Sequence, residues 1–464
     1  MPERPPFDPA LACSVSADVA IASRADAAAL AARQARRLAD LLTAAQRGSN
    51  LYRGILQGRV PAAVQLADLP IMRKPDLMRQ FRDWVADAEL KLEELRRFTA
   101  DPSRIGEPFL GRYVVWESSG SSGEPCVFVQ DASAMAVYDA LEALRRPVFQ
   151  PLRRLMDPWL LGERIVFVGA LGGHFAATVS LQRLRQLNPG LASSLHSLSF
   201  LQPIALLVAQ LQALQPTIIS TYPSAAVLLV GERRAGRLDV SPCEVWTGGE
   251  DLSPAMRKAV EEGFGCPVAN SYGASEFLSL ASQCDHGNLH LNSDWAILEP
   301  VDESGVAVAP GTAGATTLLT NLANHLQPLI RYDLGDRVAL GAAPCPCGSC
   351  LPVIEVQGRS DDTLAFRRAD GGSVQILPLA LSTVLEEEAG LFDFQLLQRG
   401  PCDLRLVTGM RGKAAAGALR RARAKLTAFL ERHGAAGVQV HCRSGVTARP
   451  GRSGKIQRIV AKAS

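Results

Sequence analysis

The stretch Glu244-Val245-Trp246-Thr247-Gly248-Gly249-Glu250-Asp251-Leu252-Ser253 decides the fold class of this chain. A short apolar run, Glu244–Trp246, leads into a turn with two adjacent glycines. A helix-like stretch, Ser253–Glu262, follows directly. A buried strand, a glycine turn and a helix in this order are typical of α/β layering.

The same alternation extends outward on both sides. Further apolar runs occur at Arg164–Val168 and Thr217–Thr221, and the helix-like stretch Pro203–Leu214 lies between them. Nearer the N-terminus, Ser133–Arg146 has helical spacing, with Ser133 as a candidate N-cap. Short apolar runs that alternate with helices predict an α/β fold with a largely parallel sheet.

The texture of the sequence changes near Gly358-Arg359-Ser360-Asp361-Asp362. Beyond this point come strand-like pieces, an Ala/Arg-rich helix at Ala414–His433 and a glycine-rich tail. We therefore expect a large N-terminal domain of layered sheets and helices, residues 1–358. A smaller, mobile C-terminal α+β domain would comprise residues 359–464.

Composition excludes several classes of protein. The 464 residues carry a formal net charge of only +3, which argues against a nucleic-acid binder. No apolar run reaches the roughly 18 residues of a transmembrane helix, so we expect no membrane span. The first residues lack the basic start and apolar region of a secretory signal, so the expected location is cytoplasmic.

Short motifs with chemical potential follow one another along the chain. They are Ser118–Gly123, Thr247–Glu250, Ser271–Glu276, Leu329–Asp336, Gly358–Asp362 and Pro450–Arg458. Each motif alone also fits an ordinary turn or solvated loop. The Ser/Gly run Ser118–Gly123 can direct backbone N–H groups at phosphate, but such runs are more often flexible surface loops. It lacks the GK[ST] ending of an ordinary P-loop.

The ordered series resembles the adenylate-forming superfamily of acyl-CoA synthetases, adenylation domains and luciferases, and most of all the phenylacetate–coenzyme A ligase family. The resemblance begins at Leu69–Leu77, similar to that family's LPxTKxDL element, and extends to Lys455. It implies activation of a carboxylic acid by ATP to acyl-AMP with release of pyrophosphate, and transfer of the acyl group to coenzyme A. ATP, Mg²⁺ and coenzyme A are the implied cofactors and co-substrates.

Carried over position by position, the resemblance implies a role for each motif. The β- and γ-phosphates of ATP would be wrapped by Ser118, Ser119, Gly120, Ser121, Ser122 and Gly123. The adenine and nucleotide would be lined by Gly248, Gly249, Glu250, Ser271, Tyr272, Gly273, Ala274 and Ser275, with Tyr272 stacking on the base. Glu276 would bind Mg²⁺, and Asp336 would accept both ribose hydroxyls. Arg359 would contact the ribose and phosphate region, Asp361 would be the hinge, and Lys455 would reach the carboxylate and the α-phosphate.

This set of residues makes chemical sense by itself. Attack of a carboxylate on an α-phosphate brings two anions together, so catalysis needs positioning and positive charge. The nucleophile is already ionised at neutral pH, so no general base is required.

Two departures from the family pattern matter. Glu124 stands where a lysine is common, and Lys74 upstream is the alternative source of positive charge. After the hinge, Ala369–Pro378 replaces a shorter family segment that borders the pantetheine tunnel in relatives. The coenzyme A assignment therefore depends on fewer matching residues than adenylation does.

Several cysteines and histidines cluster in the sequence. In a cytosolic protein, such clustering suggests a metal-binding site more than disulfide bonds. The candidate ligands are Cys284, His286, His290, Cys345, Cys347 and Cys350. Similar proteins show a C…H and CxCG pair, which favours Cys284, His290, Cys345 and Cys347, with Cys350 as an alternate. Such a set would hold a structural Zn²⁺; the alternative is free thiols in a loop.

The acid itself is the least determined feature. His174 and Phe175 resemble an element that lines the acid pocket, and Tyr222 is a second candidate for its wall. Small residues around both would suit an aromatic or otherwise bulky acid. A lone histidine is more often structural.

Two alternatives stay open. The enzyme could deliver acyl-AMP to an acyl carrier protein thiol or to an amine. The chain could also be a zinc-containing interaction protein that has lost catalysis, although Glu276, Asp336 and Lys455 are all present.

Overall fold

The computed structural model describes residues 6–118, 125–157, 160–200, 202–359, 364–368, 371–376, 378–435, 437–448 and 457–461. Its helices are α1 Pro9–Ala22, α2 Ala27–Gly48, α3 Asn50–Ile55, α4 Lys74–Arg79, α5 Phe81–Trp84, α6 Leu92–Thr99, α7 Ala132–Leu144, α8 Pro151–Met156, α9 Ala176–Leu187, α10 Ile204–Leu214, α11 Pro223–Arg234, α12 Pro254–Phe264, α13 Pro378–Thr383 and α14 Gly412–Arg432. A π-helical segment comprises Val384–Glu388, and short 3₁₀ turns occur at Pro61–Ala63, Leu66–Asp68 and Pro102–Arg104.

The strands form five sheets. The strands are β1 Val114–Glu117, β2 Val127–Gln130, β3 Ile165–Gly169, β4 Leu195–Ser199, β5 Ile218–Thr221, β6 Glu244–Gly248, β7 Val268–Ala274, β8 Phe277–Gln283, β9 Leu289–Leu291, β10 Ala296–Val301, β11 Thr316–Asn321, β12 Tyr332–Asp333, β13 Asp336–Leu340, β14 Val353–Arg359, β15 Leu364–Arg367, β16 Ser373–Ile376, β17 Gln395–Gly400, β18 Asp403–Thr408, β19 Gln439–Ser444 and β20 Ile459–Val460.

The largest sheet has nine strands in the order β13-β14-β9-β8-β7-β6-β5-β3-β4. Strands β4, β3, β5, β6 and β7 are parallel, as the alternation of strands and helices predicts. From β7 onward every pairing is antiparallel. The expectation of a largely parallel sheet is therefore wrong for half of it. The reason is that the turn between β7 and β8 has no room for a crossover helix, so the chain returns antiparallel.

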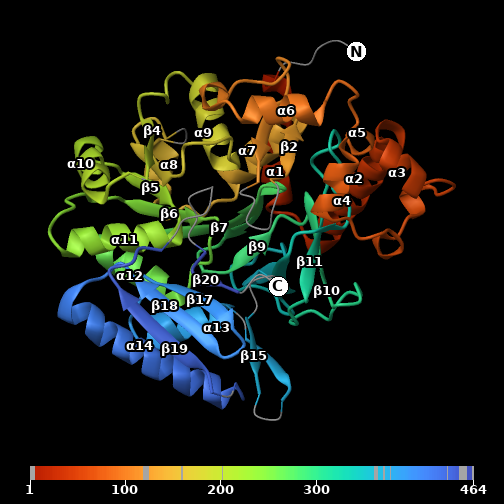
Figure 1. The fold of residues 1–464 in the computed structure, drawn as a ribbon. Coiled ribbons are helices and arrows are strands. Elements are labelled where there is room, and N and C mark those ends of the chain that lie inside the picture. The colour runs from red at the N-terminus through yellow and green to blue at the C-terminus, as the bar shows by residue number, and fades with distance from the viewer. Residues whose placement is uncertain are drawn as a thin grey trace.

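Helices α10, α11 and α12 lie beside the parallel strands in Figure 1 and share a buried apolar cluster with them. Local sequence explains where these elements begin and end. Helix α12 begins because the Ser253 hydroxyl accepts from the Met256 N–H at 3.1 Å, and it ends at Gly265, whose φ is +71°. Helix α7 has Asp131 as its N-cap, which corrects the expected cap at Ser133. The Asp131 carboxylate accepts from the Ala134 N–H at 2.9 Å, so the helix begins two residues earlier than a cap at Ser133 implies.

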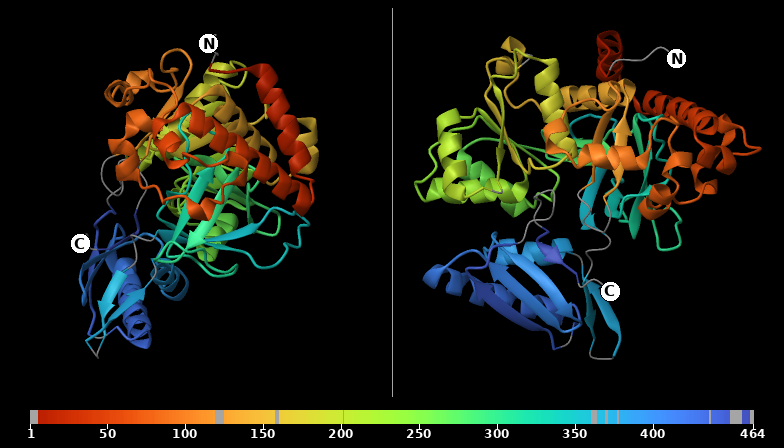
Figure 2. Two further views of the ribbon diagram at one scale, coloured as in Figure 1. Left: turned by 90° about the vertical axis from the view of Figure 1, so that its right-hand side faces the viewer. Right: turned by 45° about the horizontal axis from the view of Figure 1, so that its top comes forward.

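A separate apolar cluster lies in the C-terminal part of the chain. Its buried residues run from Leu364 to Ile459, whereas the clusters of the preceding part end at Ile354. Helix α14 covers the sheet β19-β18-β17-β20 and buries its apolar face there. Figures 1 and 2 show this part as a compact body beside the larger one. The predicted α/β class with a large and a small part is confirmed, while the boundary at residue 358 stays a prediction.

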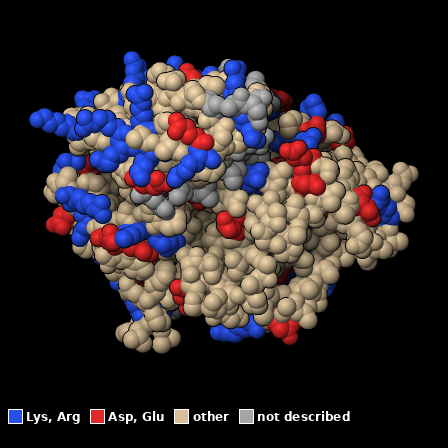
Figure 3. Space-filling view, turned by 90° about the horizontal axis from the view of Figure 1, so that it is seen from below, with Lys and Arg blue, Asp and Glu red and all other residues tan. Residues whose placement is uncertain are grey.

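Lys and Arg side chains gather on the C-terminal part. Figure 3, seen from below, shows them concentrated toward the upper left, where this part lies. The outer face of α14 contributes Lys413, Arg420, Arg421, Arg423, Lys425 and Arg432, which are all exposed. None of the helices in the described ranges has the length and apolar composition needed to cross a bilayer.

A buried ionic network ties the first helices to the sheet. The Asp294 carboxylate accepts from both ends of the Arg145 guanidinium at 2.7 and 2.8 Å, and Arg37 lies 3.4 Å from it. The Asp294 side chain is fully buried.

We expect Asp294→Ala to lower the free energy of unfolding by about 3–5 kcal/mol, because two guanidinium groups lose a buried partner. Chemical denaturation checks this value. The control is Glu262→Ala, which removes an exposed partner 3.8 Å from Lys258 and should cost less than about 0.5 kcal/mol. Equal costs for the two variants would contradict the prediction.

Candidate functional site

The carboxyl ends of the parallel strands bring two of the predicted motifs, Thr247–Glu250 and Ser271–Glu276, to one edge of the sheet. In the register, Thr221 of β5 lies opposite Thr247 of β6, and Gly248 lies opposite Ser271 of β7. Beyond this edge, the Glu250 carboxylate accepts from the Ser224 N–H at 3.1 Å. Ligands of open α/β sheets bind in this location.

Glycine is required at this edge because backbones approach closely. A Cβ at Gly248 would lie 2.9 Å from the Ser271 hydroxyl oxygen. A Cβ at Gly273 would lie 1.8 Å from the carbonyl oxygen of Leu278, which no side chain can tolerate. Gly249 has a φ of +76°, a conformation that favours glycine.

Tyr272 and Asp336 meet although 64 residues separate them. The Tyr272 hydroxyl donates to Oδ2 of Asp336 at 2.6 Å. Asp336 is the first residue of β13, and its partner across the ladder is Arg359. The predicted adenine-stacking ring, ribose acceptor and Arg359 backbone therefore lie together. The side chain of Arg359 is outside the described part of the structure.

Glu276 lies in the turn between β7 and β8, which donors from other elements hold in place. The Tyr332 hydroxyl donates to Oε1 of Glu276 at 3.0 Å, and the Asn321 amide donates to its carbonyl at 2.9 Å. The indole of Trp116 donates to the Ser275 carbonyl at 2.8 Å. These contacts fix the carboxylate predicted to bind Mg²⁺.

Lys74 lies beside the start of the predicted phosphate loop. Its Nζ donates to the Ser118 hydroxyl at 3.4 Å, and that oxygen also accepts from the Cys126 N–H at 2.9 Å. The segment before Lys74 is held by paired backbone hydrogen bonds in which Met72 bonds Arg331 and Asp333, each at 2.9 Å. A role for Lys74 as the alternative source of positive charge stays a prediction.

Three sets of predicted residues lie outside the described ranges. They are Ser119, Gly120, Ser121, Ser122 and Gly123 of the loop, the hinge Asp361, and Lys455. The nearest described residues to Lys455 are 448 and 457.

The acid-pocket candidates lie near the same edge. The Glu117 N–H donates to the His174 carbonyl at 2.8 Å, which places His174 and Phe175 beside the end of β1. The imidazole of His174 is fully buried, 5.2 Å from the Phe98 ring, and burial lowers its pKa. Tyr222 is buried against the ring of Phe200 at 5.7 Å, and burial raises the pKa of its phenol. A role for these residues in binding the acid stays a prediction.

A second constellation lies at β9 and the loop before β14. The ligand atoms of Cys284, His290, Cys345 and Cys347 all lie within 4.8 Å of one another. The Cys284 and Cys345 sulfurs are 3.8 Å apart, and Cys347 Sγ is 3.3 Å from His290 Nε2. Tetrahedral zinc with ordinary Zn–S and Zn–N bonds separates its ligands by about 3.3–3.8 Å. Cys350 is exposed and does not join this group.

Hydrogen bonds orient the imidazole of this group and affect its thiols. His290 Nδ1 lies 2.7 Å from the carbonyl oxygen of Leu351, which leaves Nε2 to face the thiols. Burial opposes ionisation of Cys345, but the Cys347 N–H and the Asn288 amide outweigh it and lower the pKa of Cys345 to about 6, whereas burial and the neighbouring thiols raise the pKa of Cys347 to about 11.

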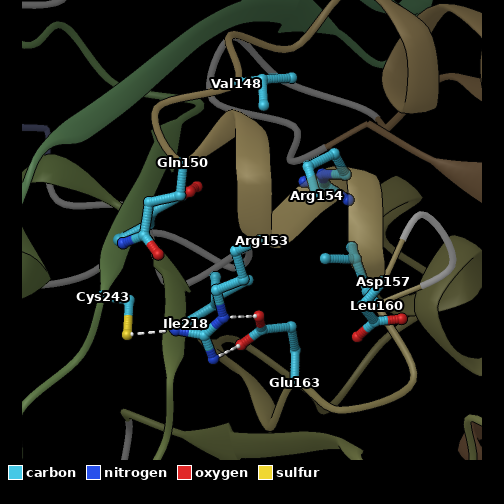
Figure 4. Close-up of a pocket in the computed structure, with 10 residues that line it drawn as sticks. Val148, Gln150, Arg153, Arg154, Asp157, Leu160, Glu163, Ile218 and Cys243 are labelled. Carbon is cyan, nitrogen blue, oxygen red and sulfur yellow. Dashed lines mark hydrogen bonds and ion pairs between the residues drawn. The ribbon is translucent and has the colours of Figure 1, made fainter.

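A hollow at the opposite edge of the sheet is a different feature (Figure 4). It is lined by Ile218 and Glu244, the first residues of β5 and β6. Arg153 lies in it with its guanidinium 2.6 Å from Glu163 and 2.8 Å from the Cys243 sulfur. Because the predicted motifs end at the other edge, this hollow is not part of the candidate site.

No direct signal in the sequence marks Trp116 or Tyr332 as supports of the site. Tyr332 lies within the Leu329–Asp336 motif, so its position in that motif is the signal that could have found it. Trp116 lies in the strand β1, which precedes the Ser/Gly loop, but nothing in its sequence neighbours indicates a contact with Ser275.

Comparisons with known proteins agree with this architecture. No family model matches the chain. The sequence is 28% identical over 284 residues to a phenylacetate–coenzyme A ligase from Thermus thermophilus, a match that covers 58% of this chain and 59% of that protein. Over 103 residues it is 30% identical to the protein CapK from Staphylococcus aureus, covering 22% and 21% of the two chains. The chain thus spans less than two thirds of the length of these relatives.

Solved structures share the fold over nearly the whole chain. A 2-hydroxyisobutyryl-CoA ligase in complex with 2-HIB-AMP has a TM-score of 0.64 at 20% identity and covers 92% of this chain and 89% of its own. A benzoate CoA ligase from Burkholderia xenovorans LB400 has a TM-score of 0.52 at 17% identity, covering 97% and 98%. The resemblance to phenylacetate–coenzyme A ligase and to the adenylate-forming fold is confirmed.

We expect Gly273→Ala to lower the free energy of unfolding by about 3 kcal/mol or more, because the new methyl group collides with the Leu278 backbone. The matched control is Gly231→Ala in α11, where a Cβ meets nothing within 4 Å. That change should stabilise the helix by up to about 1 kcal/mol. Thermal and denaturant unfolding of both variants measure the difference, and a harmless Gly273→Ala would contradict the geometry.

Proposed function

We propose that this chain, which has the adenylate-forming fold, is an ATP-dependent acid–coenzyme A ligase. The enzyme activates a carboxylic acid to acyl-AMP, releases pyrophosphate, and passes the acyl group to coenzyme A with release of AMP. One observation carries the proposal: Glu276, the Tyr272–Asp336 pair and the Lys74–Ser118 contact belong to motifs that converge around the carboxyl edge of the sheet and the strands beside it. Each group has the chemistry that one part of ATP needs.

Each of the described site residues would bind a different part of ATP. Asp336 offers carboxylate oxygens to the ribose hydroxyls, and Tyr272 offers its ring to the adenine. Lys74 and Ser118 supply positive charge and a hydroxyl to the phosphates. Glu276 is a hard oxygen ligand that suits Mg²⁺, which when bound would offset the charge of the phosphates.

Formation of acyl-AMP, the first step of the reaction, needs no general base. The ionised carboxylate forms a bond to the α-phosphorus of ATP, and the bond to the pyrophosphate oxygen breaks. Lys455 would lie between the carboxylate and the α-phosphate and stabilise the charge that develops there. The thiol of coenzyme A then loses its proton to solvent and forms a bond to the acyl carbon, and the bond from that carbon to the AMP oxygen breaks.

We extend the proposal to the C-terminal residues 359–464 and to the substrate. This part would be a mobile domain that carries Lys455 and turns at Asp361. An aromatic acid is supported by Phe175, Tyr222 and Phe200 near the site and by the named activity of the phenylacetate–coenzyme A ligase relative. Coenzyme A as acceptor is supported by the names of the structural neighbours, with a carrier-protein thiol as the alternative acceptor.

The Cys284, His290, Cys345 and Cys347 group fits a structural zinc. Three sulfurs and one imidazole nitrogen fill a tetrahedral site and leave no open position for catalysis. The group joins the β8–β9 turn to the loop between β13 and β14, so bound zinc would stabilise this end of the sheet.

Adenylation is tested by pyrophosphate release with ATP, Mg²⁺ and a panel of acids that includes phenylacetate, benzoate and 2-hydroxyisobutyrate. We expect release with an aromatic acid, and formation of a thioester only when coenzyme A is added. If a thioester forms on an acyl carrier protein and not on coenzyme A, the carrier protein is the acceptor. Absence of acid-dependent release and of Mg²⁺-dependent ATP binding would show the proposal to be wrong.

Lys455→Ala should slow acyl-AMP formation by at least about a hundredfold, the scale of losing one preorganised charge-stabilising donor. The same variant should keep most of its activity with supplied acyl-AMP and coenzyme A. Asp361→Pro should have the reverse pattern. Lys413→Ala, an exposed lysine of α14, is the control and should change neither step. Equal loss in both steps would remove the assignment of Lys455.

Purified protein should contain about one zinc per chain, measured without added metal. Cys347→Ser should lower the melting temperature markedly, because metal binding contributes directly to folding. Cys350→Ser and Cys13→Ser, both at exposed thiols, are the controls. Less than about a tenth of an equivalent, with a melting temperature unchanged by chelator, would exclude the zinc site.

A further inference from the structure

The carboxylate of Glu386 joins three segments of the chain. Glu386 lies in the π-helical segment Val384–Glu388 of the C-terminal part. One carboxylate oxygen accepts from the Ser253 hydroxyl of the large N-terminal part, and the other pairs with the guanidinium of Arg458. The Glu386 side chain is fully excluded from solvent. We call Ser253, Glu386 and Arg458 the Glu386 clamp.

Arg458 reaches both parts of the protein. Its Nη2 donates to the Phe392 carbonyl at 2.8 Å, and its guanidinium lies 4.1 Å above the Phe394 ring. Its Nη1 lies 3.4 Å from the Met256 sulfur of α12. Arg458 is therefore held by several contacts in a single geometry.

Ser253 connects the Glu386 clamp to the carboxyl edge of the large sheet, where the proposed nucleotide site lies. Its hydroxyl oxygen caps α12 by accepting from the Met256 N–H at 3.1 Å while it donates to Glu386. Ser253 follows Glu250, the last residue of the Gly248–Glu250 turn, by three positions. A shift of Glu386 would thus act on the helix start that directly follows this turn.

Burial of the Glu386 and Arg458 charges carries a desolvation cost, so the Glu386 clamp is an inefficient way merely to stabilise the fold. A buried ion pair often stabilises no better than apolar side chains of similar volume, and its best-attested use is to specify one arrangement. Glu388, two residues later, offers the contrast, because it forms exposed pairs with Lys425 and Arg432 of its own domain. Glu386 instead spans the two parts.

We propose that Glu386 is a positioning residue for adenylation, since its contacts with Ser253 and Arg458 hold Arg458 beside the start of α12. Lys455 precedes Arg458 by three residues, which span at most about 10 Å of extended chain. The inference rests on the proposed function, because only acyl-AMP formation uses Lys455. The clamp therefore belongs to that step and not to thioester formation.

The test compares Glu386→Gln with Glu388→Gln in the full-length protein. Hydrogen exchange of the amides at the start of α12 should rise in Glu386→Gln and stay unchanged in the control. Single-turnover acyl-AMP formation should fall by at least about tenfold, because misplacement of a reacting group is costly. Thioester formation from supplied acyl-AMP and coenzyme A should change by less than about threefold.

A second variant covers the case in which Glu386→Gln does not fold. Glu386→Leu combined with Arg458→Met removes the buried charges together, which preserves folding more often than removal of one partner. It should give the same split between the two steps. Equal loss in both steps, or loss in neither, overturns the positioning role, and unchanged hydrogen exchange overturns the clamp. If the wild-type protein forms no acyl-AMP from any acid, the proposed function and the positioning role both fail, while hydrogen exchange still reports whether the clamp holds the two parts together.

Discussion

The close approach of Gly273 to the Leu278 backbone is the constraint on which the candidate site depends. It allows β7 to return directly as β8, and the large sheet changes there from parallel to antiparallel. The turn that results presents Glu276, while the preceding strand presents Tyr272. Trp116, Tyr332 and Asp336 each bond this strand or its turn from another segment. One tight turn thus organises groups that lie far apart in the sequence.

The protein has separate apolar cores for its large and small parts, so the contacts between the parts must be specified by other means. Ser253, Glu386 and Arg458 supply such a contact through directional hydrogen bonds and charge. The desolvation cost and the directional geometry of these contacts favour one specific arrangement of the two parts over non-specific association. These contacts hold Arg458 beside the start of α12, which follows the carboxyl edge of the large sheet.

The Cys/His group lies on β9 and in the loops beside it, at the antiparallel end of the same sheet. It joins the antiparallel end of the sheet near β9 and β14, and β14 leads to the residues expected to form the hinge. A metal at this position would hold that end of the sheet without taking part in the chemistry. The groups proposed for adenylation and the group proposed for zinc are therefore separate features of one sheet.

The sequence by itself determined the α/β class, the order of the motifs and the set of metal-ligand candidates, because glycine turns, strand–helix alternation and Cys/His spacing are local properties. It also indicated Lys74 as a substitute charge near the phosphate loop. Only the tertiary structure decided that half of the large sheet is antiparallel, that Tyr332 and Trp116 support the Ser271–Glu276 motif, and that Glu386 bonds across the two parts. Such contacts join residues many positions apart, and no local pattern specifies them. They depend on how the strands pair and how the separate cores pack, which is settled only when the whole chain has folded.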